Sequence, residues 1–198
     1  MKKIFSFLTL IFVFIIGKAQ HNYFHQQPLF MYGFRLAYNV PFEKQYSTHD
    51  FLSESVYTEF GAFFRTGKYV YGEVGINYSF HKTTFNSTIT DTIVDAFAEL
   101  RYIQIPIRVL GYLPIGNEMA FTPNVGVIYQ PLVAVKNNDA FYQRDAIQKH
   151  QFLFSAGLGF RFHFLSLELN YRKMLRNFYN DRDGKKPNYL NITLGFQF

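Results

Sequence analysis

Apolar and polar residues alternate along most of the chain, in eight segments separated by polar or turn-forming stretches. The clearest segment is QFLFSAGLGFRFHF, residues 151–164, in which every second residue from Phe152 to Phe164 is apolar. From Ser155 onward, the intervening positions hold serine, glycine, arginine and histidine. Successive side chains of a β-strand point to opposite faces, so this period of two predicts a strand with one apolar and one polar face.

The other segments follow the same rule and are unusually long. Most run to about 9–13 residues, close to the length that a tilted strand needs to cross a bilayer. Strands of ordinary globular proteins average about 5–6 residues. The alternation predicts strands at residues 29–40, 55–65, 69–81, 96–112, 119–130, 151–164, 165–172 and 189–198.

The fourth segment departs from strict alternation. It alternates cleanly only from Ile103, and its parity slips between Glu99 and Tyr102. An extra residue in one strand of an antiparallel pair produces such a slip, so we expect a β-bulge there. Pro106 cannot donate a ladder hydrogen bond within the same segment.

The connections between the segments alternate in length. Outer-membrane barrels have short periplasmic turns and longer external loops, and an even number of strands puts both chain termini on the periplasmic side. The pattern therefore predicts periplasmic termini. The long connections are residues 41–54, 82–95, 131–150 and 175–188, and the short ones are 66–68, 113–118 and the turn near Phe164.

A soluble barrel of the lipocalin kind shows the same alternation turned inside out. Three features favour the membrane. The apolar face is nearly free of charge, the connections alternate in length, and the C-terminal Phe198 is in register with Phe196 on an apolar stripe. A terminal aromatic residue of this kind is the usual insertion signal read by the barrel-assembly machinery. We therefore expect an all-β fold, an eight-stranded antiparallel transmembrane β-barrel of the outer-membrane type, over residues 20–198.

Composition agrees with a chain that has apolar surroundings. Aromatic residues make up 20% of the sequence, with 25 Phe and 15 Tyr, which is high for a soluble domain. There are no cysteines, which excludes disulfides, thiol catalysis and a lipoprotein anchor. Without the three lysines of the first twenty residues, 17 basic residues face 14 acidic ones. This dispersed excess gives no reason to expect nucleic acid as a partner.

The first twenty residues, MKKIFSFLTLIFVFIIGKAQ, resemble an export signal. A basic pair precedes an apolar run from Ile4 to Ile16, and Gly17-Lys18-Ala19 follows as a small-x-small cleavage site. The apolar run is shorter than the roughly 20 residues of a membrane-spanning helix. We predict a cleaved signal peptide at residues 1–19.

Several strands carry sequences that resemble the PorT-like outer-membrane β-barrel proteins of Bacteroidetes. RYIQIPIRVLGYL (101–113) is similar to an aromatic-x-x-Ile-Pro strand of that family, and FTPNVGVIY (121–129) to its Pro-x-x-Gly strand. FSAGLGFRF with LSLELNYRKMLRNF, and the terminal NITLGFQF, resemble its last three strands. The resemblance implies the barrel fold and, for some relatives, a part in protein export by the type IX secretion system. It carries no catalytic motif.

The polar face holds eight charged residues, which in an eight-stranded barrel meet in a lumen just wide enough to be filled by side chains. We interpret them as an ion-paired plug, since pairing offsets the cost of burying charge. The alternative is a narrow channel or small-ligand site, which would prefer anions because arginines are in excess. The residues are Arg35, Glu59, Arg65, Glu73, Arg108, Arg161, Glu168 and Arg172.

Other candidate chemistry is sparse. No GxSxG, HExxH or paired-carboxylate spacing occurs, so we predict no enzyme, no metal and no cofactor, with a lipid-modifying barrel enzyme as the least favoured alternative. The loop DRDGKK could bind lipopolysaccharide phosphates through Arg182, Lys185 and Lys186. We expect a structural or interaction role in the outer membrane. The expected partners are lipid, lipopolysaccharide and envelope or secretion proteins.

Overall fold

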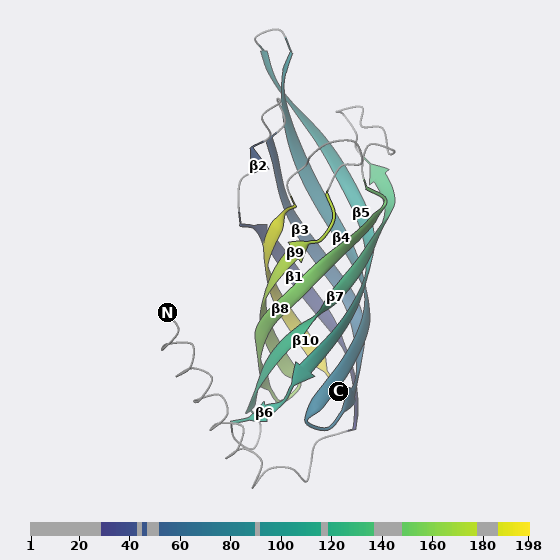
Figure 1. Ribbon diagram of the computed structural model, residues 1–198, viewed down its shortest axis with the longest axis vertical. Coiled ribbons are helices and arrows are strands. Elements are labelled where there is room, and N and C mark those ends of the chain that lie inside the picture. Colours follow the sequence, from purple (N-terminus) through teal and green to yellow (C-terminus); the bar gives the residue numbers. More distant parts are fainter. Residues whose placement is uncertain are drawn as a thin grey trace.

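The computed structural model describes residues 29–42, 45–46, 52–89, 92–115, 119–136, 148–177 and 186–198. The predicted signal peptide lies outside these residues. Eight long strands form the wall of a barrel, and β2 and β6 are two-residue additions (Figure 1). The strands are β1 (Phe30–Pro41), β2 (Gln45–Tyr46), β3 (Leu52–Gly67), β4 (Val70–Ile89), β5 (Thr92–Gly111), β6 (Leu113–Pro114), β7 (Met119–Lys136), β8 (His150–Phe162), β9 (Leu165–Met174) and β10 (Asn188–Gln197).

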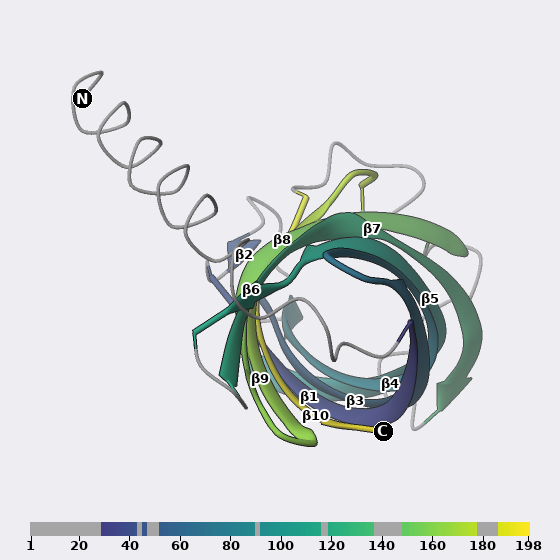
Figure 2. The same ribbon diagram turned by 90° about the horizontal axis from the view of Figure 1, so that it is seen from below.

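The wall closes because β1 pairs with β3 on one side and with β10 on the other. All neighbouring strands run antiparallel, and the view along the axis shows an unbroken ring (Figure 2). Closure leaves no open sheet edge in the wall, as lipid requires. The predicted closed antiparallel barrel of eight long strands is confirmed.

Short turns join the strands at one end, which we call the lower end. Lys68 and Tyr69 connect β3 to β4, and His163 and Phe164 connect β8 to β9. Gly67 takes a φ of 145° just before the first turn, a conformation that glycine adopts without steric cost. The C-terminal residue is also at this end, where Phe198 and Tyr32 exchange backbone hydrogen bonds of 2.8 and 3.1 Å.

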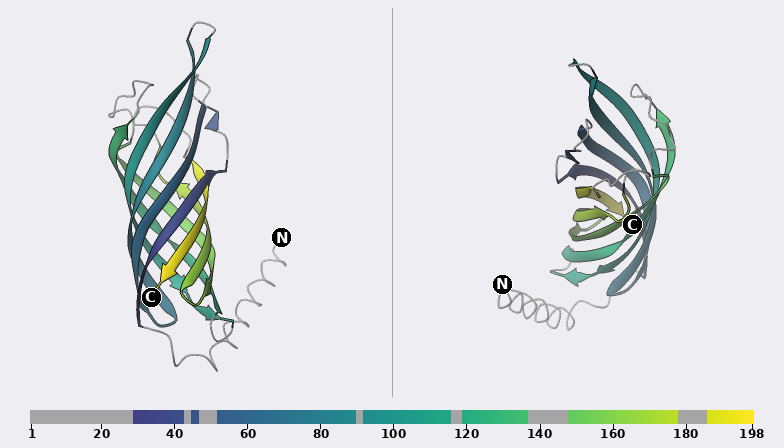
Figure 3. Two further views of the ribbon diagram at one scale, coloured as in Figure 1. Left: turned by 180° about the vertical axis from the view of Figure 1, so that it is seen from behind. Right: turned by 45° about the horizontal axis from the view of Figure 1, so that its top comes forward.

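At the opposite, upper end, several strands run further than the alternation predicts. Residues 82–95, expected as a long polar connection, instead continue β4 to Ile89 and begin β5 at Thr92. The sequence lacks the alternation here, but the backbone ladder between the two strands continues. The threonines of this stretch favour extended structure. The resulting hairpin rises well above the rest of the barrel (Figures 1 and 3).

The apolar face of the strands points outward. On β1, Phe34 is 63% exposed while Arg35 beside it is 3% exposed, and on β9 the values are 55% for Leu167 and 2% for Glu168. A soluble barrel would bury the apolar face instead, so this orientation excludes the lipocalin-like alternative. Within the described residues, no helix is long and apolar enough to span a bilayer.

The expected bulge is present, but on the neighbouring strand. Arg101 pairs with Ala134 and Tyr102 pairs with Leu132, so the extra residue is Val133 of β7. Strand β5 itself keeps its parity. Its alternation is obscured because Glu99 and Arg101 point outward and form an ion pair of 2.7 Å, while their neighbour Tyr102 is buried in the lumen.

Candidate functional site

The middle of the lumen holds an ion-paired cluster around Glu73 of β4. Its carboxylate accepts hydrogen bonds from Arg65 Nε and Arg108 Nε, each at 2.7 Å, and from Arg35 Nη2 at 2.9 Å. The three arginines come from three other strands, β3, β5 and β1. All four residues are at most 4% exposed. One carboxylate thus ties together half of the barrel wall.

A second carboxylate completes this cluster. Glu168 of β9 accepts from Arg108 Nη1 at 2.6 Å and from Arg65 Nη2 at 2.7 Å. Arg65 also donates to Gln197 Oε1 of the last strand at 2.8 Å. Arg108 and Arg65 each bridge both glutamates, whereas Arg35 pairs with Glu73 alone among the described carboxylates. Such multiple pairing is how a buried charge regains the solvation that it loses.

A second polar group lies on the upper side of this cluster. Arg172 forms an ion pair with Glu59, and Asn39 contacts both of them at 3.2 and 3.0 Å. Asn191 donates to Asn39 at 2.9 Å. Asn170 donates to Asn191 at 3.1 Å and reaches Glu168 Oε2 at 3.5 Å, which links the two groups into one network.

Inward glycines make room for these long side chains. A Cβ at Gly75 would lie 2.7 Å from Arg35 Nη2, and one at Gly126 would lie 2.8 Å from Arg108 Cγ. Both distances are shorter than non-bonded atoms tolerate, so each arginine occupies space that a side chain at the glycine position would need. The glycines at 75 and 126 therefore leave room for the side chains of Arg35 and Arg108.

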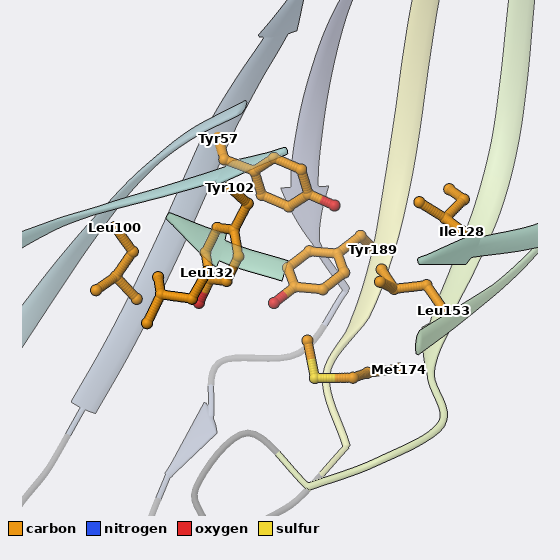
Figure 4. Close-up of a cluster of buried hydrophobic side chains, with 8 residues drawn as sticks. All are labelled: Tyr57, Leu100, Tyr102, Ile128, Leu132, Leu153, Met174 and Tyr189. Atoms are coloured by element: carbon orange, nitrogen blue, oxygen red, sulfur yellow. The ribbon is translucent and has the colours of Figure 1, made fainter. Parts of the chain in front are cut away.

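The upper part of the lumen is filled by a buried apolar cluster that we call the upper plug (Figure 4). Tyr57 and Tyr189 meet edge to face with their ring centres 5.1 Å apart. All eight side chains are at most 6% exposed, so this part of the lumen is packed like a protein core. The upper plug consists of Tyr57, Leu100, Tyr102, Ile128, Leu132, Leu153, Met174 and Tyr189.

His81 lies against the upper plug, between two of its rings. Its imidazole stacks on Tyr57 at 3.8 Å and contacts Tyr102 at 4.6 Å between ring centres. Its Nε2 is 3.3 Å from the hydroxyl of Ser79. A serine beside a histidine can form a nucleophile–base pair, but Ser79 is fully buried and His81 is 2% exposed. A lipid substrate has no access to this pair, so we assign it a packing role.

A chain of glutamines, which the sequence reasoning did not single out, lines the neighbouring wall. Gln104 donates to Gln130 at 3.0 Å, Gln130 donates to Gln151 at 3.2 Å, and Gln151 donates to the Tyr102 hydroxyl at 3.4 Å. The residues lie on β5, β7 and β8. Their inward parity was visible in the sequence, but uncharged amides gave no signal of pairing.

The lower part of the lumen holds a second apolar cluster, the lower plug, made of Met31, Tyr71, Leu110, Tyr112 and Ala120. Arg161 lies here and not in the central network. Its guanidinium contacts the Met31 sulfur at 3.2 Å and lies 5.6 Å from the Tyr112 ring centre, and its Nε donates to the His163 carbonyl. The expectation that Arg161 joins the ion-paired residues is therefore wrong. It sits too close to the lower opening to reach Glu73 or Glu168.

The structure places the remaining candidate residues as follows. Arg182 and Lys185 lie outside the described residues, and Lys186 is exposed just before β10. Phe196 and Phe198 lie on the outer face of the seam between β10 and β1. The described residues contain no group of three side chains that could hold a metal ion.

No protein family profile and no curated protein matches the chain. Among solved structures it is similar to the outer membrane protein OprG from Pseudomonas aeruginosa, with 12% identity, 85% of this chain and 95% of that chain covered, and a TM-score of 0.54. The outer membrane protein Ail from Yersinia pestis (14% identity, 84% and 99% covered) and LpxR from Salmonella typhimurium (8%, 84% and 99%) give TM-scores of 0.37 and 0.38. The similarity to OprG shows that the chain has the fold of an outer-membrane β-barrel.

Proposed function

We propose that this chain is an outer-membrane protein that serves as a membrane-anchored docking platform for an envelope protein. The wall supplies the anchor, because its outer face is apolar along all eight long strands. The lumen supplies rigidity. The upper and lower plugs bracket the ion-paired network, so the described interior is filled at three successive levels. The binding function is then carried by the parts that project above the wall.

The observation that carries this proposal is the hairpin formed by the upper ends of β4 and β5. Strand β4 pairs with β3 only as far as Thr84, and β5 pairs with β7 only from Glu99. Among the described strands, residues 85–89 of β4 pair only with residues 92–96 of β5, and these pair only with them. Their outer edges therefore present backbone donors and acceptors that an extended peptide can use to add a strand.

More specifically, we propose that the chain is a subunit of an envelope or type IX secretion machine. This proposal is supported by the resemblance of residues 101–113 and 121–129 to PorT-like barrels. A docking hairpin on a closed barrel suits a subunit that must hold a partner at the membrane without passing material through its own lumen. On this proposal the chain has no enzymatic activity.

Site-specific photocrosslinking in native cells tests the docking role. A crosslinking amino acid is placed in turn at 85, 86, 87 and 88 on β4, with lipid-facing Ile76 as the matched control on the same strand. Strand addition predicts one protein adduct whose yield alternates with period two along the edge, and none at Ile76. Adducts with lipid alone at every position would refute the docking role.

A narrow anion channel is the second candidate, because the central network holds four arginines and three glutamates. This surplus of one positive charge would favour anions in any water-filled path. The two plugs oppose such a path. Conductance measurements decide between the two candidates.

A further inference from the structure

Charged side chains on the outer surface gather at the upper end of the apolar belt. Lys82 of β4, Glu99 of β5 and Lys136 of β7 are cross-strand partners in one transverse row. Arg101, two residues from Glu99, pairs with it. Three cations therefore surround one carboxylate on the outer faces of adjacent strands, and the row keeps an excess of positive charge.

The same charge continues around the wall. Lys149 precedes β8, Lys173 lies near the end of β9, and Arg176 follows β9; all three are exposed. The lower end differs: there Lys68 is the one lysine or arginine that is exposed among the described residues. We call the six upper residues the basic rim: Lys82, Arg101, Lys136, Lys149, Lys173 and Arg176.

Aromatic rings lie directly against this rim. The Arg101 guanidinium is 5.5 Å from the centre of the Phe80 ring, and that ring packs against Tyr78 and Phe60 at 4.8 and 6.0 Å. Arg176 lies 5.2 Å from the centre of the Phe152 ring. Aromatic rings topped by cations mark the level where acyl chains end and lipid head groups begin. The basic rim is thus at phosphate level.

We propose that the basic rim binds the phosphates of lipopolysaccharide in the outer leaflet, with its acyl chains against the aromatic rings. Cations bind phosphate oxygens through charge-assisted hydrogen bonds, and each further cation near an anionic surface strengthens the attraction. The difference in exposed positive charge between the two ends of the barrel identifies the lipid that carries the phosphates. Phospholipids occur in both leaflets, whereas a rim at one end alone matches a lipid confined to one leaflet. The inference rests on the outer-membrane location in the proposed function and on the predicted periplasmic termini, which put the upper end on the outer side.

Lipid retention by the folded barrel tests this inference. The refolded mature protein is mixed with bisphosphorylated lipid A, with monophosphoryl lipid A or with phosphatidylglycerol, and the bound lipid is counted by native mass spectrometry. The variant is Lys82→Gln, Arg101→Gln, Lys136→Gln combined, and Lys68→Gln at the lower end is the matched control. Resistance to SDS before boiling verifies that each variant is folded, and the single substitution Lys136→Gln replaces the triple variant if that variant does not fold.

We expect wild type and Lys68→Gln to bind bisphosphorylated lipid A most tightly. The triple variant should bind it at least about tenfold more weakly, and the single variant a few-fold more weakly. Unchanged lipid A binding by the folded variants would overturn the site. Equal binding of phosphatidylglycerol would overturn lipopolysaccharide as its source. The readout needs no protein partner, so it is independent of whether the hairpin docks one.

Discussion

Arg108 of β5 and Glu168 of β9 form an ion pair of 2.6 Å across the lumen, although β7 and β8 separate them in the wall. Arg65 of β3 reaches the same carboxylate from the other side at 2.7 Å. These pairs connect strands that share no backbone ladder. The ion pairs of the network therefore stabilise the barrel by joining opposite parts of its wall across the lumen.

The Glu73→Gln variant tests whether the ion pairs across the lumen stabilise the barrel. It leaves Arg35, Arg65 and Arg108 buried with a single carboxylate, and breaking a buried pair in this way costs about 3–5 kcal/mol. Urea unfolding in lipid vesicles should show a loss of that size. The control is Glu99→Gln, whose partner Arg101 lies on the outer surface, and it should change stability little. Similar decreases in the free energy of unfolding for both variants would contradict a stabilising role of the ion pairs across the lumen.

Gly75→Ala tests whether the arginines fill the lumen completely. The new methyl group would lie 2.7 Å from Arg35 Nη2 and 2.9 Å from the Ala62 carbonyl oxygen, and such overpacking costs about 1–3 kcal/mol. Gly72→Ala is the control on the same strand, since its nearest atom, the Thr66 carbonyl oxygen, is 3.9 Å away. The unfolding free energy should fall in the first variant only. Equal stability would show that the interior has room to spare.

Leu100→Ala tests the packing of the upper plug. Leu100 is fully buried, so truncation should leave a cavity and cost about 2–5 kcal/mol. Ile107→Ala on the same strand is the comparison, because Ile107 is 58% exposed on the outer face and its loss creates no internal cavity. If Ile107→Ala proves the more damaging of the two in an unfolding titration, the upper plug is not a packed core.

Removal of Phe198 separates its structural role from its predicted role as an insertion signal. The deletion abolishes two backbone hydrogen bonds to Tyr32 and the contact between the two rings, whose centres are 6.2 Å apart. Purified protein should refold into vesicles with modestly reduced yield. If Phe198 is also the predicted insertion signal, assembly in cells should fall much further than refolding of the purified protein. If refolding into vesicles and assembly in cells fall equally, the contact between Phe198 and Tyr32 alone explains the effect of the deletion.

The barrel could be predicted because alternation depends on a single physical rule. Each residue on the membrane part of the wall faces either lipid or lumen, so polarity reports its face directly. The rule stops where the surroundings become uniform. Residues 82–95 lack the alternation, although β4 continues to Ile89 and β5 begins at Thr92.

The interior was predictable only in part. Parity placed Arg35, Glu73, Arg108 and Glu168 inside, but the partners depend on the stagger of the strands, which no local pattern encodes. Arg161 is an example: parity correctly placed it in the lumen, but it lies beside the lower plug and not in the ion-paired network. The plugs were hidden for a related reason: parity places Tyr57 on the inward face, but its packing with Tyr102 and Met174 from distant strands is not visible in the sequence.

Planar-bilayer recording tests the closed lumen, the central claim of this account, most directly. The interior is filled by the two plugs and the network between them, so the reconstituted barrel should show no unitary conductance above the lipid baseline. A variant with Tyr57, Tyr102 and Tyr189 changed to glycine should stay silent as well, because the central network and the lower plug remain in the lumen. An anion-selective conductance in the wild-type protein that Arg108→Ala abolishes would contradict the claim and establish the lumen as a channel.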